Sequence, residues 1–311
     1  MMRVIANLRC IGILLLTVVV YADSLPVDVY LLGGQSNMQG VADVRKIPSG
    51  LERVPGMFYY YGPTVCGAGA PNTLYDCVTP TGGGGKPGWF GPEVGFVNRM
   101  KELRPDVTIA LIKYAKGGTS LIKDWNPGAD TSDVGNWGPQ FDGFVRTVTN
   151  GLAALRAAGY EPRIVGMLWQ QGEQDAKNGW ERRRNPPVAI AGETAAAAQY
   201  QKNLTYFINR VREQFSEDIG PDGLRIVLGT VLPYAPPGGD VEKRFTEREQ
   251  IITAQLNIGK MVKDVETIRC DETITPTNAQ IIDGFRDTDE VHLSARGQLT
   301  LGRLMAEKMC R

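Results

Sequence analysis

The chain contains a single histidine, His292, in the stretch DTDEVHLSARG. Zinc enzymes normally use two or three imidazoles, so a zinc site of that type is nearly excluded. Nucleophilic chemistry that uses an imidazole base near neutral pH would have to use His292. Asp289, three residues earlier, could accept a hydrogen bond from the ring and fix its tautomer. An isolated Asp-x-x-His pattern is more often explained by helix capping, a role open to Asp289 or Ser294.

A serine with the surroundings of a nucleophile lies near the start of the chain. The stretch VYLLGGQSNMQG, residues 29–40, passes from an apolar strand pattern into two glycines and then Ser36. The glycines allow a tight turn that exposes the hydroxyl group at the carboxyl end of a strand. Taken alone, Ser36 could simply cap a helix.

Two further apolar segments end in residues suited to a hydrolase site. The first is followed by AKGGTS (115–120), whose glycine N–H groups could face a substrate without obstruction by side chains. The second runs into WQQGEQD (169–175), with an amide at Gln171 and carboxylates at Glu173 and Asp175. The carboxyl ends of parallel strands share one sheet edge, so we predict that these groups gather there with Ser36 and His292.

The elements that must position these groups alternate along the chain. Buried strands are predicted where runs are nearly continuously apolar and rich in β-branched residues, at 27–34, 57–61, 106–115, 163–172 and 225–234. Helices are predicted from longer amphipathic stretches at 92–104, 140–158, 195–216, 242–262 and 294–309. The alternation predicts one α/β domain, a three-layer α/β/α doubly wound parallel sheet. The Gly- and Pro-rich segment 62–91 interrupts it and is expected to form an ordered wall.

The N-terminus has the pattern of a secretory signal. Arg3 and Arg9 form a basic segment before an apolar run, Cys10–Val20, and Val20 and Ala22 fit the small-residue rule for cleavage. We expect residues 1–22 to be a signal peptide and residues 23–311 the mature domain, secreted or, in a bacterium, periplasmic. A membrane anchor is the alternative, but the run is shorter than the roughly 20 residues that span a bilayer.

Charge and cysteine content agree with export. The chain has 34 basic and 34 acidic residues, and loss of Arg3 and Arg9 with the signal would leave 32 and 34, a net charge of −2. This balance gives no indication of nucleic acid or of an anionic membrane as a partner. Four cysteines follow the signal, and an even set in an exported chain usually forms disulfides. Proximity along the chain favours Cys66–Cys77 and Cys270–Cys310 among three possible pairings.

Four sequence blocks together resemble a known family. They are GQSNM (34–38), KGGTSL (116–121), WQQGEQDA (169–176) and DEVHLSARGQLTLG (289–302). Their types and order resemble the signature blocks of the SGNH-hydrolase superfamily, and more narrowly those of sialate O-acetylesterases and the acetylxylan esterases of carbohydrate esterase family six. The blocks extend over almost the whole mature chain.

The resemblance implies roles for individual residues. Ser36 would be the nucleophile, His292 the base and Asp289 the acid that orients it, although Glu173 is also available for that last role. An oxyanion hole would be formed by the N–H groups of Ser36 and Gly117 and by the side-chain amide of Gln171. Gly118 is the near alternative to Gly117.

The implied activity is removal of O-acetyl groups from a carbohydrate through an acetyl-serine intermediate, without a metal or organic cofactor. Acetylxylan-like polysaccharides and O-acetylated sialic acid are both candidate substrates. An indole can stack on a sugar face or simply pack in the core, and both roles are open to Trp89, Trp125, Trp137 and Trp180. The alternative from another class is a non-catalytic glycan-binding protein on the same scaffold.

Overall fold

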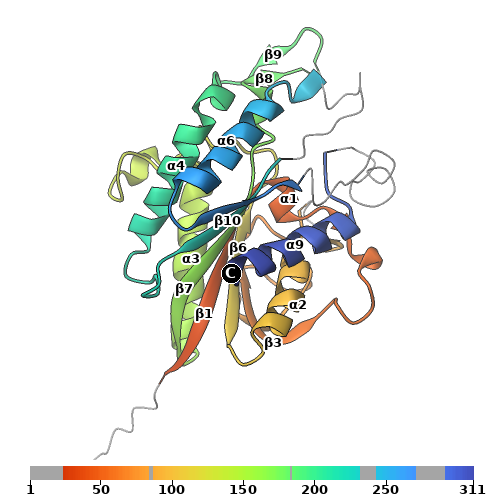
Figure 1. Cartoon of the computed structure of the whole chain (residues 1–311), viewed down its shortest axis with the longest axis vertical. Coiled ribbons are helices and arrows are strands. Elements are labelled where there is room, and N and C mark those ends of the chain that lie inside the picture. Colours follow the sequence, from red (N-terminus) through yellow and green to blue (C-terminus); the bar gives the residue numbers. More distant parts are fainter. Residues whose placement is uncertain (1–23, 84–86, 183, 232–242, 271–290) are drawn as a thin grey trace, which may run out of the picture.

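A seven-stranded sheet forms the centre of the molecule, in the strand order β11-β10-β7-β1-β6-β3-β4 (Figure 1). The computed structural model describes residues 24–83, 87–182, 184–231, 243–270 and 291–311. The strands are β1 (Leu25–Gly34), β3 (Val54–Tyr61), β4 (Tyr75–Val78), β6 (Ile109–Ala115), β7 (Tyr160–Gln170), β10 (Arg225–Gly229) and β11 (Val265–Ile268). Adjacent strands are parallel except β3 and β4, which pair antiparallel. Two short antiparallel pairs lie outside this sheet, β2 (Ala42–Asp43) with β5 (Trp89–Phe90) and β8 (Trp180–Glu181) with β9 (Val188–Ala189).

Helices cover both faces of the sheet. The helices are α1 (Ser36–Gln39), α2 (Glu93–Leu103), α3 (Pro139–Ala157), α4 (Ala196–Gln214), α6 (Arg248–Met261) and α9 (Ala295–Met309). Helices α3, α4 and α6 lie on one face and α2 and α9 on the other (Figure 1). Three short 3-10 helices complete the described elements, η1 (Val44–Lys46), η2 (Val134–Asn136) and η3 (Asp175–Lys177). The predicted three-layer doubly wound sheet is therefore confirmed.

Strand β1 shows why the central strands read as continuous apolar runs. Val29 and Leu31 pack into the core beneath α3, α4 and α6, whereas Tyr30 and Leu32 pack into the core beneath α2 and α9. Successive side chains of a strand point to opposite faces, so a strand covered on both sides needs apolar residues at every position. All five predicted strands and all five predicted helices are present. The short edge strands β4 and β11 were not predicted.

Three central strands end at the same level. Gly34 at the end of β1 is paired with Ala115 of β6 and Gln170 of β7. The backbone of Gly34 has φ +144°, and a Cβ there would lie 2.2 Å from the Gln170 carbonyl oxygen. Only glycine fits this close approach. The loops that follow these strands consequently meet at one edge, as the sequence predicted.

The predicted disulfides are not formed. All four cysteines of the described chain are free thiols. The Cys77 sulfur accepts a hydrogen bond from Arg53 Nε at 3.0 Å, and the Cys310 sulfur lies 3.6 Å from Met100 Sδ. Cys270 is buried in the core beneath α2 and α9. Proximity along the chain did not predict the cysteine pairing correctly, because the fold places other groups next to these sulfur atoms.

Two predictions fall outside the described residues: the signal peptide at 1–22 and the acid Asp289. Among the helices of the described residues, none combines the length and the apolar character that a membrane span requires.

Candidate active site

Ser36 and His292 lie in contact, although 256 positions separate them in the sequence. His292 Nε2 is 3.0 Å from Ser36 Oγ. Ser36 is the first residue of α1, directly after the sharp end of β1, and is 8% exposed. His292 lies just before α9, whose N-cap Ser294 accepts a hydrogen bond from Gly297 N. A serine hydroxyl within hydrogen-bond reach of an imidazole nitrogen is the arrangement that a base-activated nucleophile requires.

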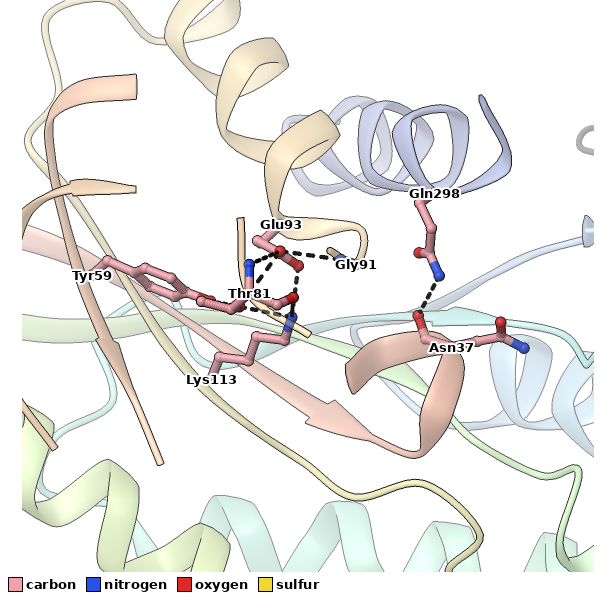
Figure 2. A network of polar contacts seen from close by, with 7 residues as sticks. All are labelled: Asn37, Tyr59, Thr81, Gly91, Glu93, Lys113 and Gln298. Atoms are coloured by element: carbon pink, nitrogen blue, oxygen red, sulfur yellow. Dashed lines mark hydrogen bonds and ion pairs between the residues drawn. The ribbon is translucent and has the colours of Figure 1, made fainter. Parts of the chain in front are cut away.

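Asn37, the residue after the serine, fixes the segment that carries His292. Its side chain is fully buried; Nδ2 donates to the Val291 carbonyl at 3.2 Å, and Oδ1 accepts from Leu293 N at 3.0 Å. The Asn37 carbonyl accepts from Gln298 Nε2 of α9 at 3.1 Å (Figure 2). The hydrogen bonds of Asn37 thus connect the segment of the nucleophile to the segment of the base. The sequence gives no signal for this role of Asn37, since nothing along the chain shows which groups its amide reaches.

Glu173 supplies a buried carboxylate to the same place. It follows β7, lines the cavity beside Ser36, and accepts a hydrogen bond from Asn37 Nδ2 at 2.7 Å. Burial raises the pKa of Glu173, while the hydrogen bond from Asn37 and the positive charge of His292 act to lower it. Its second oxygen, Oε2, is enclosed without a hydrogen-bond partner in the described structure. Glu173 therefore lies where a negative charge interacts with the imidazolium form of His292.

Gly117 is brought to the serine, but its N–H group is engaged. A Cβ on Gly117 would lie 3.3 Å from Ser36 Cβ, which places the glycine directly against the nucleophile. Its N–H donates to Gln39 Oε1 at 3.0 Å. Gly118, the near alternative, also lines the cavity and has φ +70°.

Gln171 does not face the cavity. It is fully buried, and Nε2 donates to Asp175 Oδ2 at 2.6 Å and to the Thr119 carbonyl at 3.1 Å. Its Oε1 accepts from Tyr200 OH at 3.1 Å. Both ends of the amide are therefore committed inside the protein. The structure brings Ser36, Gly117 and His292 together, whereas the Gln171 amide joins the loop after β6 to Asp175.

The site opens into a cavity of about 480 Å³. Besides the residues above, its wall includes Gln35, Val41, Gly83, Trp89, Lys177, Arg244 and Phe245. Trp89 is 42% exposed, so its indole is available to a ligand. The guanidinium of Arg244 lies 4.8 Å from the centre of the Phe245 ring. Among the other tryptophans considered for sugar stacking, Trp125 is wholly buried and belongs to the core.

A buried ion pair supports one wall of this cavity. Lys113 Nζ lies 2.7 Å from Glu93 Oε2, and both side chains are fully buried. The same lysine donates to the Thr81 carbonyl, and Glu93 Oε1 accepts from Thr81 N and Gly91 N (Figure 2). These bonds hold the Gly-rich segment on both sides of Gly83. Within the described residues, no three side chains of the metal-ligating types come together.

Comparisons with known proteins give a family and similar solved structures. Residues 26–311 match the family described as "Carbohydrate esterase, sialic acid-specific acetylesterase". Curated proteins give no match. The crystal structure of NanS is similar, with a TM-score of 0.58 and 13% identity over 93% of this chain and 98% of that one. The structure of XAC1771, a carbohydrate acetylesterase from Xanthomonas citri, has a TM-score of 0.54 and 16% identity over 90% of this chain and 55% of that one.

At such identities the two structures support the fold alone. The family match extends over nearly all of the chain and includes all four blocks that carried the resemblance. The chain belongs to the sialic acid-specific acetylesterase family of carbohydrate esterases.

Proposed function

We propose that this protein is a secreted serine esterase that removes O-acetyl groups from a carbohydrate through an acetyl-serine intermediate. The observation that carries the proposal is the 3.0 Å contact between His292 Nε2 and Ser36 Oγ, two residues that line one cavity, in a chain of a carbohydrate acetylesterase family. The family description makes O-acetylated sialic acid one candidate substrate, and acetylated xylan-like polysaccharides are the other.

The mechanism follows from the positions of the two side chains. His292 Nε2 accepts the Ser36 hydroxyl proton as Oγ forms a bond to the acetyl carbonyl carbon, and the carbonyl oxygen becomes an oxyanion. The bond from that carbon to the sugar oxygen then breaks, and the imidazolium gives its proton to the leaving oxygen. Water attacks the acetyl-serine with His292 again as base, which releases acetate and restores Ser36.

A carboxylate beside His292 would stabilise the imidazolium in both halves of the cycle. Asp289, the acid of the matching sequence block, is proposed for this role. Glu173 is the second candidate, because the positive charge of His292 acts to lower the pKa of this carboxyl group. Substituting each acid separately by its amide and comparing the losses in kcat identifies the partner.

Acetate release from a panel of esters tests the proposal. The panel contains acetylxylan, acetylated pectin, O-acetyl sialic acid, a short-chain lipid ester and p-nitrophenyl acetate. We expect the wild type to release acetate from at least one glycan, and Ser36→Ala and His292→Ala to lower kcat by roughly 10⁴-fold or more. Binding of a glycan without acetate release would instead indicate a binding protein. For export, the N-terminus of the secreted protein should be Asp23.

A further inference from the structure

The turn at Gly117 and Gly118, which follows β6, forms a part of the cavity wall that lies directly against Ser36. The position that a Cβ of Gly117 would take is 3.3 Å from Ser36 Cβ, and Gly118 has φ +70° and lines the cavity. Two adjacent glycines are conformationally permissive, so their own sequence does not fix where the turn lies. Among the described residues, the backbones of the two glycines make one hydrogen bond, from Gly117 N to Gln39 Oε1 at 3.0 Å. Gln39 is therefore the polar anchor of this turn.

The Gln39 side chain is itself held in place. Gln39 is the last residue of α1 and is almost wholly buried, and its backbone N donates to the Gln35 carbonyl at 2.7 Å. The other end of the amide, Nε2, donates to the Thr64 carbonyl, which leaves Oε1 to face Gly117. Gly83 packs against the same amide, because a Cβ on Gly83 would lie 2.7 Å from Gln39 Oε1. The amide thus joins the helix of the nucleophile to two walls of the cavity, the turn after β6 and the Gly-rich segment.

We infer that Gln39 is a positioning residue, which holds the Gly117–Gly118 turn against Ser36 so that the acetyl group meets a preformed wall. The inference rests on the proposed function, because it concerns the rate of that reaction. Gln39 acts through the turn and does not need to touch the substrate. Loss of the anchor would let the glycine pair move, and a displacement of about 1 Å at the reacting groups can lower a rate by about 10²-fold. The effect should therefore appear in kcat more than in KM.

A second glutamine with the same bonding pattern provides a matched control. Gln255 is fully buried; its Oε1 accepts from Val231 N at 3.0 Å, and its Nε2 donates to the Gln171 carbonyl at 2.8 Å. Gln255 does not line the cavity. Truncating either glutamine removes buried hydrogen bonds and should lower the free energy of unfolding. Only Gln39 anchors a turn that lies against the nucleophile, so only its truncation should slow the reaction of the folded protein.

Gly83 provides a way to displace the amide without removing it. The methyl group added by Gly83→Ala would overlap Gln39 Oε1, so this substitution should push the amide away from Gly117. In a protein that also carries Gln39→Ala, the same methyl group has no amide to displace. The effects of the two substitutions on kcat should therefore not multiply, whereas the effects of independent substitutions do.

Steady-state kinetics on p-nitrophenyl acetate test the inference, with rates divided by the folded fraction from the unfolding curve of each variant. We expect Gln39→Ala and Gly83→Ala each to lower kcat by about 10- to 100-fold, with KM changed only a few-fold. The double variant should have the kcat of Gln39→Ala. Gln255→Ala should keep kcat within about threefold of the wild-type value, because distant sites act independently.

Three results would overturn the positioning role. They are a kcat within threefold of the wild type in Gln39→Ala or Gly83→Ala, losses that multiply in the double variant, and an equal loss of kcat in Gln255→Ala. Gly83→Ala keeps the amide and decides the matter alone if Gln39→Ala does not fold. An active wild type with an unaffected Gln39→Ala would overturn this assignment only. A wild type that neither releases acetate nor is labelled at Ser36 by a phosphonate ester would overturn the proposed function, and this assignment with it.

Discussion

The side chain of Asn37 hydrogen-bonds the backbone on both sides of His292, at the Val291 carbonyl and at Leu293 N. The peptide groups that flank the imidazole are therefore fixed by the residue that follows the nucleophile. A third bond from the same amide reaches Glu173. Asn37 does not itself need to touch a substrate to affect the reaction, because it sets the position of the base.

Removing this amide should impair catalysis more than binding. We expect Asn37→Ala to lower kcat by roughly 10- to 100-fold, since a displacement of about 1 Å at the reacting groups can have that effect. KM for p-nitrophenyl acetate should change little. The loss of buried hydrogen bonds should also lower the free energy of unfolding by about 1–3 kcal/mol. Steady-state kinetics and urea denaturation measure both, and an unchanged kcat would contradict the positioning role.

The Glu173 carboxylate should support the charge that His292 acquires. Glu173→Gln keeps an oxygen for Asn37 Nδ2 but removes the negative charge, so kcat should fall by roughly 10- to 100-fold. The matched control is Glu193→Gln, which neutralises another buried carboxylate that accepts from Gln174 and does not line the cavity. Equal kinetics of the two variants would argue against a role for Glu173 in the reaction.

The exposed indole on the cavity wall should contribute to glycan binding. Trp89→Ala should raise KM for an acetylated glycan by about fivefold, since aromatic contacts are worth on the order of 1 kcal/mol. The small ester p-nitrophenyl acetate should be affected much less, because it is too short to use the indole. Trp180 is 43% exposed but is not part of the cavity wall, so Trp180→Ala is the control. Equal changes on both esters would place Trp89 outside the sugar site.

Asp175 should make stability depend on pH. Burial raises the pKa of Asp175 from 3.8 to about 7, against hydrogen bonds from Leu121, Ile122 and Gln171 that lower it. The folded protein thus binds this proton more tightly than the unfolded chain does. The contribution of Asp175 to the free energy of unfolding is therefore greatest below about pH 4 and is lost as the pH rises towards 7.

Comparison with Asp175→Asn isolates this effect. The free energy of unfolding of the wild type, relative to that of the variant, should decrease by a few kcal/mol between about pH 4 and pH 7. Denaturation curves at several pH values provide the measurement. Parallel pH profiles for the two proteins would mean that Asp175 does not titrate in this range.

The buried ion pair behind the Gly-rich wall should be sensitive to loss of one partner. Glu93→Gln leaves the Lys113 ammonium buried without a counter-charge, which typically costs about 3–5 kcal/mol. Glu93→Gln combined with Lys113→Met should recover at least part of that loss, because no isolated charge remains. Denaturation in urea compares the three proteins. A double variant less stable than Glu93→Gln would show that the pair itself is not the source of the effect.

Much of the architecture could be predicted because its signal is local. Strands buried on both faces are continuously apolar, and Gly34 at the end of β1 marks a close approach that no larger residue could make. Strand β4 gave no such signal, since it is short and lies within a Gly- and Pro-rich segment at the sheet edge. The pairing of Ser36 with His292 could be anticipated from the position of each residue relative to the strands and from the single imidazole in the chain.

The finer chemistry depended on contacts that no local pattern encodes. The block that contains Gln171 predicts an amide at the site. Hydrogen bonds to Asp175 and Thr119 orient that amide into the protein interior. Amide side chains occupy every second position around the serine, at Gln35, Asn37 and Gln39, and this spacing is visible in the sequence. Their partners are not, because these amides reach loops that are distant in the sequence: the loop after β7, the segment before α9 and the loop after β6.

That arrangement ties chemical competence to completion of the fold. The amides before and after the nucleophile hydrogen-bond the loop after β6, the loop after β7 and the segment that precedes α9. The serine therefore comes into contact with its base only when α9 packs on the sheet. A folding intermediate that still lacks that helix would hold an inert hydroxyl, and the onset of ester cleavage would mark the arrival of the native state.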